Sequence, residues 1–96
     1  MALTLCCLLW SRPGQEEALV AYEDRVLELL DDHDGKLLSR VRSDGGDGHA
    51  LEIQLFEFPS DDELDGYLGD ARRSAMATER DRAVLRTDLI RVEPVT

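Results

Sequence analysis

The sequence is poor in positive charge. Lys and Arg together number 11, against 21 Asp and Glu, which gives a formal net charge of −10 at pH 7. Binding to nucleic acid needs a basic face that contacts the phosphates, and binding to anionic lipid headgroups needs basic residues as well. We therefore expect no nucleic acid and no membrane among the partners of this protein.

Cysteine is also scarce, and long apolar runs are missing. The two cysteines, Cys6 and Cys7, are adjacent, so on a strand they would point to opposite faces and would be poorly placed to bridge each other. No stretch approaches the length of about 20 apolar residues that a membrane helix needs. The first twelve residues, MALTLCCLLWSR, lack the basic start and the cleavage site of a secretory signal. We expect two free thiols and a cytoplasmic protein.

The remaining composition fits one small domain. Hydrophobic residues make up 43% of the 96 residues, and their positions are patterned, which excludes a disordered chain. A chain of this size buries only about two-thirds of its unfolded surface, so it gains stability by dimerising. We expect a single domain over residues 1–96.

The spacing of the apolar residues predicts the order strand, helix, strand, strand, helix, strand. Strands are expected at 3–10, 36–42, 50–58 and 85–92, and helices at 15–32 and from Ser60 onward. Residues 72–82 either continue the second helix or form a kinked extension of it. This order is typical of an α+β, ferredoxin-like βαββαβ fold, in which a four-stranded antiparallel sheet carries two helices on one face.

The two middle strands form a predicted hairpin around the turn at 43–48. If Arg40 lies opposite Glu52, the apolar faces of the strands coincide and the charges meet across the ladder. This register places Arg40, Glu52 and Gln54 on the sheet face that the helices leave open. We expect that face to pack against a second copy of the chain, giving a homodimer.

Four short stretches of the sequence carry a family resemblance: residues 21–23, 35–40, 56–60 with Tyr67, and 80–82 with 86–89. They resemble the dimeric α/β-barrel superfamily, and most closely an uncharacterised bacterial group in it that is related to antibiotic-biosynthesis-type monooxygenases. The resemblance implies a homodimer whose sheets pack face to face, with a cavity between sheet and helices in each subunit. The wider superfamily includes cofactor-free monooxygenases, haem-degrading enzymes, polyketide cyclases and ligand-sensing domains, and the fold alone does not choose among these activities.

Three amphipathic aromatic residues are candidates for the wall of a ligand pocket. Trp10, Tyr22 and Tyr67 each lie at the end or on the inner stripe of a predicted element. Aromatic walls with a few polar groups are typical of small-molecule pockets. The alternative for each is ordinary core packing, with the polar tip bonded to water or to a carbonyl.

Two further residues are candidates for catalysis. Arg73 follows the apolar stripe of the second helix and would anchor an anionic substrate or stabilise an enolate, unless it pairs with a carboxylate on the helix surface. His33 stands at the end of the first helix among three aspartates, where it would act either as a base at the pocket mouth or as a helix cap.

The sequence predicts no metal and no cofactor. Segments 31–34 and 44–48 are rich in Asp, but the first lacks the spacing of a calcium loop and the second occurs only once, so a helix end and a hairpin turn explain them better. Neither histidine lies mid-strand or mid-helix, as a haem ligand in the cavity would. The function that we predict is a small-molecule enzyme resembling cofactor-free monooxygenases or cyclases, with a non-catalytic ligand-binding or structural homodimer as the alternative.

Overall fold

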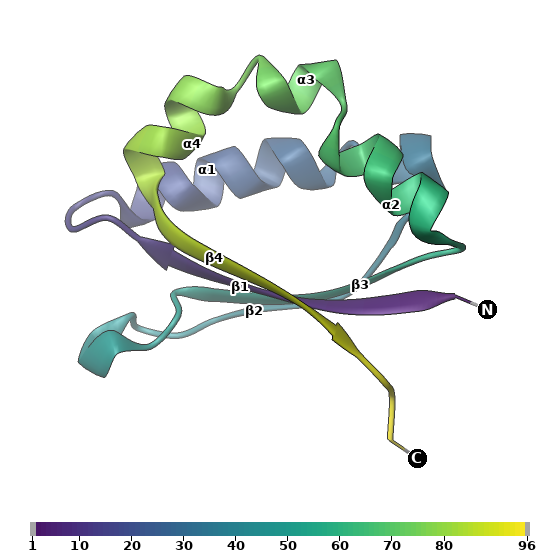
Figure 1. Cartoon of the computed structure of the whole chain (residues 1–96). Helices are drawn as coiled ribbons and strands as arrows, with labels where there is room; N and C mark the ends of the chain where they lie inside the picture. The colour runs from purple at the N-terminus through teal and green to yellow at the C-terminus, as the bar shows by residue number, and fades with distance from the viewer. Residues whose placement is uncertain (1, 96) are drawn as a thin grey trace.

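A computed structural model describes residues 2–95 of the chain, which form one four-stranded antiparallel sheet with helices packed on one face (Figure 1). The strands lie in the order β2-β3-β1-β4. The predicted α+β, ferredoxin-like fold is confirmed. The strands are β1 (Leu3–Ser11), β2 (Lys36–Arg42), β3 (Glu52–Phe58) and β4 (Val84–Val92), the helices are α1 (Glu16–Leu27), α2 (Asp61–Leu68), α3 (Ala71–Ser74) and α4 (Ala77–Ala83), and the short 3-10 turns are η1 (Asp31–His33) and η2 (Gly46–Gly48).

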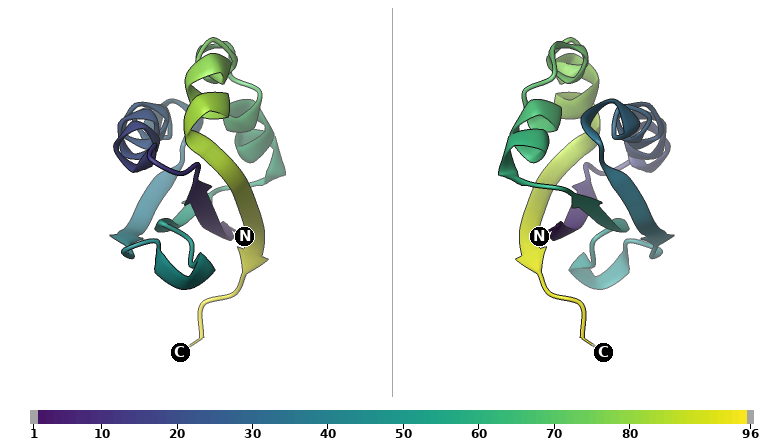
Figure 2. Two further views of the ribbon diagram at one scale, coloured as in Figure 1. Left: turned by 90° about the vertical axis from the view of Figure 1, so that its left-hand side faces the viewer. Right: turned by 90° about the vertical axis from the view of Figure 1, so that its right-hand side faces the viewer.

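Between α2 and β4 the chain forms two short helices rather than one long one. Gly69 ends α2, and the carboxylate of Asp70 starts α3 by accepting a hydrogen bond of 2.8 Å from the backbone N–H of Arg72. Residues Ala75 and Met76 separate α3 from α4. Segment 72–82 is therefore a kinked extension. Together α2, α3 and α4 run alongside α1 and return to the sheet at β4 (Figure 2).

The central position of β1 agrees with its apolar sequence, but only one of its faces is buried within a single chain. Leu5, Cys7 and Leu9 point toward the helices and are almost fully buried. Cys6 and Leu8 point the other way and stay partly exposed. The second face of β1 stays open because the helices cover one side of the sheet only.

The pairing of β2 with β3 differs from the predicted register by two residues. Arg40 lies opposite Gln54 rather than Glu52, and Arg42 lies opposite Glu52. The register shifts by one residue between Leu37 and Ser39, which accounts for one of the two residues of the offset. The ion pair between Arg40 and Glu52 still forms, across the diagonal of the ladder.

The predicted open face of the hairpin is also wrong. Glu52 and Gln54 are 0% and 1% exposed and lie beneath the helices, and Arg40 reaches the carboxylate of Asp24 in α1 at 2.7 Å. Phe56 and Phe58 decide the orientation, since they share this side of β3 and are the largest apolar side chains that the strand has to bury. Glu52 and Gln54 lie on the same side of β3 as these two rings and are therefore buried with them.

The face of the sheet that points away from the helices is instead mostly apolar. Trp10 lies at one end of it, where its indole N–H donates to the carbonyl of Gly48 at 2.9 Å and the Arg86 guanidinium stacks 4.7 Å from its ring centroid. The strand registers place these apolar side chains in the middle of this outer sheet face: Cys6, Leu8, Val41, Ile53, Leu55 and Ile90.

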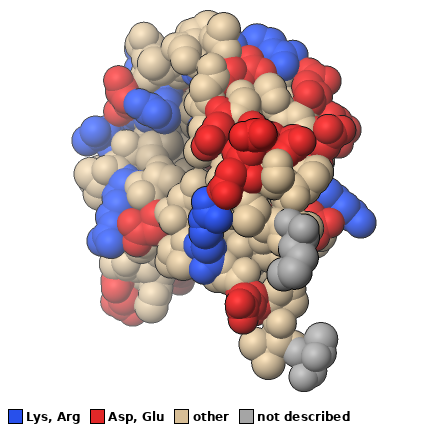
Figure 3. Space-filling view, turned by 45° about the vertical axis from the view of Figure 1, so that its right-hand side comes forward, with Lys and Arg blue, Asp and Glu red and all other residues tan. Residues whose placement is uncertain are grey.

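Acidic side chains gather on the side of the molecule that carries α2 (Figure 3). Asp61, Asp62 and Glu63 occupy the first turn of this helix, where negative charge interacts favourably with the helix dipole. None of the helices within residues 2–95 has the length and apolar character needed to cross a lipid bilayer.

Candidate functional site

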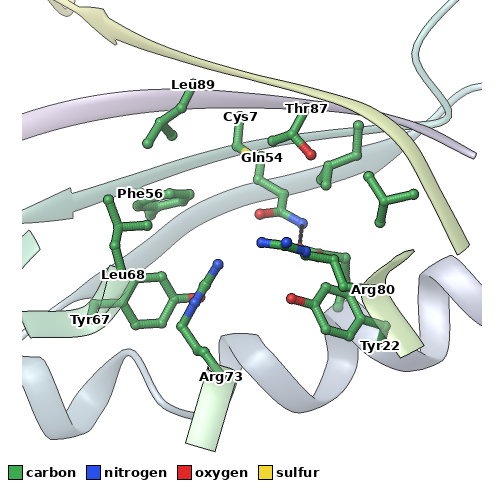
Figure 4. A pocket seen from close by; sticks show the side chains of 13 residues that line it. Cys7, Tyr22, Gln54, Phe56, Tyr67, Leu68, Arg73, Arg80, Thr87 and Leu89 are labelled. Atoms are coloured by element: carbon green, nitrogen blue, oxygen red, sulfur yellow. Dashed lines mark hydrogen bonds between the residues drawn. The ribbon is translucent and has the colours of Figure 1, made fainter. Parts of the chain in front are cut away.

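A pocket lies between the sheet and the helices (Figure 4). The space inside it is about 570 Å³ when the part that opens to solvent is counted. All four helices contribute to its wall or roof. The strands supply a mostly apolar floor made of Cys7, Leu9, Phe56, Val84, Thr87 and Leu89.

Glu23 brings a buried carboxylate to this pocket. It lies on α1, is 5% exposed, and accepts a hydrogen bond of 2.8 Å from the side-chain amide of Gln54. Burial raises the pKa of Glu23, while the Gln54 hydrogen bond and the charge of Arg73 act in the opposite direction. A carboxyl group with a raised pKa is suited to take a proton near neutral pH.

Gln54 links this carboxylate to a second buried one. Its amide nitrogen donates to Glu23 and also to Glu52, each at 2.8 Å, so both amide hydrogens are used. The charge of Glu52 is offset by Arg40 and by Arg42, whose Nε lies 3.2 Å away. Among the residues that the structure describes, no such ion pair reaches Glu23. The charge of Glu52 is therefore compensated within the fold, whereas Glu23 has a neutral amide as its hydrogen-bond partner.

The two tyrosines of the pocket differ in what their hydroxyl groups do. The Tyr67 hydroxyl donates to the carbonyl of Val26 at 3.1 Å, and burial raises the pKa of Tyr67 to about 12. The Tyr22 hydroxyl has no protein partner within residues 2–95 and points into the pocket (Figure 4). Burial raises the pKa of Tyr22 as well, against the opposing charge of Arg73. The Tyr67 hydroxyl thus links α2 to α1, whereas the Tyr22 hydroxyl is available for a hydrogen bond to a ligand.

Two guanidinium groups enter the pocket from the roof. Arg73, on α3, lies 4.5 Å from the centroid of the Tyr67 ring, a distance at which a cation is attracted to the aromatic face. Arg80, on α4, lines the same pocket (Figure 4). Unlike Arg72, which pairs with Asp32 and Asp70 outside the pocket, Arg73 has no carboxylate partner among the described residues.

The structure places some of the predicted site residues in the pocket and others outside it. Tyr22, Tyr67 and Arg73 line the pocket, whereas Trp10 does not, because it points to the outer sheet face. The expectation that Trp10 is a pocket residue is wrong. Trp10 follows Leu9 on the strand, and neighbours on a strand point to opposite faces, so the burial of Leu9 turns Trp10 outward.

His33 is also absent from the lining of the pocket. Its Nε2 lies 2.7 Å from a carboxylate oxygen of Asp70, and its ring meets the edge of the Tyr67 ring at a centroid distance of 6.1 Å. Arg72, and then His33, hold the pKa of Asp70 well below its usual range. The geometry makes His33 a link between η1 and the start of α3.

Sequence reasoning missed Glu23, although the sequence contains the signal. Leu19, Tyr22, Glu23 and Val26 follow the spacing i, i+3, i+4, i+7, and all four are buried on the inner side of α1. A charged residue inside an otherwise apolar stripe indicates a carboxylate directed at the interior.

Comparisons with known proteins show the fold and leave the activity open. No protein-family model matches the chain, and no curated protein matches it in sequence. A protein of unknown function from Rhodopseudomonas palustris has a similar structure, with a TM-score of 0.79 and 20% identity over 99% of this chain and 83% of that one. The protein PA3566 from Pseudomonas aeruginosa gives a TM-score of 0.76 at 17% identity, covering 99% and 95%. An uncharacterised NIPSNAP-like domain protein from Burkholderia xenovorans gives 0.75 at 11% identity, covering 99% and 86%.

Proposed function

We propose that the protein is a small-molecule enzyme in which Glu23 removes a proton from a substrate bound in the pocket between sheet and helices. The observation that carries this proposal is the position of Glu23, a buried carboxylate with a raised pKa and no ion-pair partner among the described residues, at the wall of a pocket. Burial of an ionisable group costs stability, and such groups concentrate at functional sites.

The chemistry follows from the groups around the pocket. Glu23 takes the proton from an acidic C–H or phenolic O–H, and the electron pair left behind is delocalised onto a substrate oxygen. The Arg73 guanidinium and the Tyr22 hydroxyl stabilise that oxygen as its negative charge grows. The apolar floor keeps water away, which strengthens both interactions. Gln54 holds the carboxylate in place by its amide hydrogen bond.

The resemblance to cofactor-free monooxygenases and cyclases supports this class of reaction. In both, the substrate supplies an acidic proton, and the protein has to hold the substrate, exclude water and stabilise the anion that forms. Deprotonation is the step that the residues of this pocket suit. Which of the two reactions follows depends on the substrate.

Exchange of substrate protons for deuterium tests this proposal. Aryl methyl ketones exchange their methyl protons only slowly in D₂O, and NMR follows the loss of the signal. We expect the protein to accelerate the exchange, and Glu23→Gln to reduce the accelerated rate by roughly 10²- to 10⁴-fold. Glu28→Gln, at the exposed end of α1, is the matched control and should exchange at the unmodified rate. Equal exchange by Glu23→Gln and the unmodified protein, with ketone bound to both, would contradict the proposal.

The outer sheet face supports a second proposal, the pairing of two copies of the chain. Its apolar centre around Leu8, Ile53 and Leu55 is uncovered, which is unusual for a surface patch in a monomer. Opposite charges flank the centre, with Arg86 and Asp88 bonded at 2.9 Å on one side. An apolar centre with a mixed-charge rim is typical of an isologous homodimer interface. If the pocket lacks catalytic activity, a ligand-binding or structural homodimer is the alternative function.

A further inference from the structure

The mouth of the pocket has a polar extension that proton removal does not use. A second hollow continues outward from the pocket and shares Tyr22, Leu68, Arg73 and Arg80 with it. Ser74 and Ala77 complete its lining. The site therefore has two parts, an inner chamber with an apolar floor and an outer opening lined mainly by polar groups, with both guanidinium groups at the boundary between them.

The charges around the site do not cancel. Ionised Glu23 offsets one of the two guanidinium groups, so one positive charge remains. Glu52 contributes nothing to this balance, because Arg40 and Arg42 already pair with it. Asp81 offsets Arg80 little, because its 3.5 Å contact with Arg80 is at an exposed position where ion pairs are weak. The excess positive charge occurs in a chain whose net charge is −10.

We infer that the ligand is an organic monoanion, whose carboxylate or equivalent head group binds to Arg73 and Arg80 and whose apolar body fills the inner chamber. A monoanion brings the charge of the site to zero while Glu23 is ionised. Proton transfer to Glu23 then moves negative charge onto the ligand without changing that total. Guanidinium groups match the planar geometry of a carboxylate and can donate two parallel hydrogen bonds to it. This inference names the substrate class of the proposed enzyme and in that respect rests on the proposed function.

A pair of probes that differ only in charge tests the inference. The acid 4-acetylbenzoate and the neutral 4-acetylbenzamide have the same ring, the same ketone and nearly the same size, and both carry exchangeable methyl protons. Binding is measured by isothermal titration calorimetry or by NMR titration at low salt. We expect the unmodified protein to bind the acid at least about tenfold more tightly than the amide.

Four variants locate the effect. Arg73→Gln and Arg80→Gln should each reduce the preference for the acid by about tenfold, and Arg73→Lys should retain part of it, since the charge stays and the paired donors are lost. Arg82→Gln is the matched control, because Arg82 is exposed on the same helix as Arg80 and does not line the site. It should leave the preference unchanged. Circular dichroism and melting temperatures establish that all variants are folded.

Glu23→Gln separates this inference from the proposed enzyme function. The substitution removes a negative charge from the site, so the acid should bind more tightly while proton exchange is lost. If the protein binds the acid more tightly than the amide but does not accelerate proton exchange, the anion site is supported and the proposed enzyme function is contradicted. If the protein accelerates proton exchange in both probes and binds them with similar affinity, the anion site is contradicted. The inference is also overturned if neither probe binds, or if Arg82→Gln reduces the preference as much as Arg73→Gln does.

Discussion

At the scale of single residues, Glu23 is the feature that separates this pocket from ordinary packing. A buried carboxylate destabilises the folded chain unless something compensates its charge. Glu52 has two arginines for this purpose, whereas Glu23 has one neutral amide and the distant charge of Arg73. The difference supports the proposed role of Glu23 as the base of the pocket.

The stability of the protein should depend on pH through Glu23. Its pKa is raised above the ordinary value of 4.5, so the folded chain holds this proton more tightly than the unfolded chain does. The resulting stabilisation is complete below the pKa of the unfolded state and is lost as the pH rises through the higher pKa of the folded state. We expect Glu23→Gln to remove this loss and to become more stable than the unmodified protein as the pH increases.

Urea unfolding at several pH values between 5 and 8 measures this effect. Glu28→Gln serves as the control, since residue 28 is exposed at the end of the same helix and its substitution should leave the pH dependence intact. Parallel stability curves for Glu23→Gln and the unmodified protein would show that Glu23 titrates in the same way in the folded and unfolded chains.

The two tyrosines should respond differently to loss of the hydroxyl. Tyr67→Phe removes the hydrogen bond to the Val26 carbonyl and should lower the free energy of unfolding by about 1 kcal/mol. Tyr22→Phe removes a hydroxyl that has no protein partner within residues 2–95, and should change stability by less than about 0.5 kcal/mol while weakening ligand binding. Chemical denaturation of both variants checks the expectation. Equal destabilisation would mean that Tyr22 also has a structural bond.

At the scale of elements, a close approach joins α2 to η1. Gly66 lies inside α2, where glycine is less favourable than alanine by about 1 kcal/mol. A Cβ at this position would lie 3.1 Å from Nδ1 of His33. Glycine at position 66 therefore lets His33 reach Asp70 at 2.7 Å and hold the start of α3, the helix that carries Arg73.

A double-mutant cycle tests this contact. Gly66→Ala alone should be neutral or destabilising, because the gain in helix propensity is offset by the clash with the imidazole. In the background of His33→Ala the same substitution should stabilise the protein by about 0.5–1 kcal/mol. If Gly66→Ala has the same effect in both backgrounds, His33 is not the reason for the glycine.

The sequence predicts the positions of the helices and strands well, but it predicts less well which side of a strand points toward the helices. The apolar pattern locates all four strands, by a continuous run in β1 and by alternation in β2 and β3, and the apolar stripe locates α1. The orientation of β3 fails because Glu52, Gln54, Phe56 and Phe58 share one side, and the two polar residues suggested an open face. The contacts with Arg40, Arg42 and α1 compensate the burial of those polar residues, and such contacts between distant segments are not visible in local periodicity.

At the scale of the whole molecule, the outer sheet face should govern association. Leu55→Lys places a charge in the apolar centre of this face and should convert a homodimer into a monomer, because pairing would remove that charge from water without a partner. Leu68→Lys is the control, since Leu68 is an equally apolar residue, 43% exposed, on the helix side. Sedimentation velocity gives the mass of each variant.

The single tryptophan reports on the same face. Trp10 lies at one end of it, so dilution of a dimer should expose the indole to water and shift its fluorescence to longer wavelength. A protein that sediments as a monomer at high concentration, with the same mass after Leu55→Lys, would contradict the homodimer. The fold and the pocket of the single chain would be unaffected by that result.

The most direct test of the account is the titration of Glu23 itself. NMR of the side-chain carboxyl carbons of the glutamates, with Glu23→Gln used for assignment, follows Glu23 as the pH is raised, first in the free protein and then with 4-acetylbenzoate bound. We expect Glu23 to titrate at a higher pH than the exposed glutamates. The bound anion should raise its midpoint further, because a nearby negative charge disfavours ionisation of the carboxyl group. A midpoint in the range of the exposed glutamates, unchanged by the ligand, would contradict the central claim that Glu23 is a buried base facing the ligand pocket.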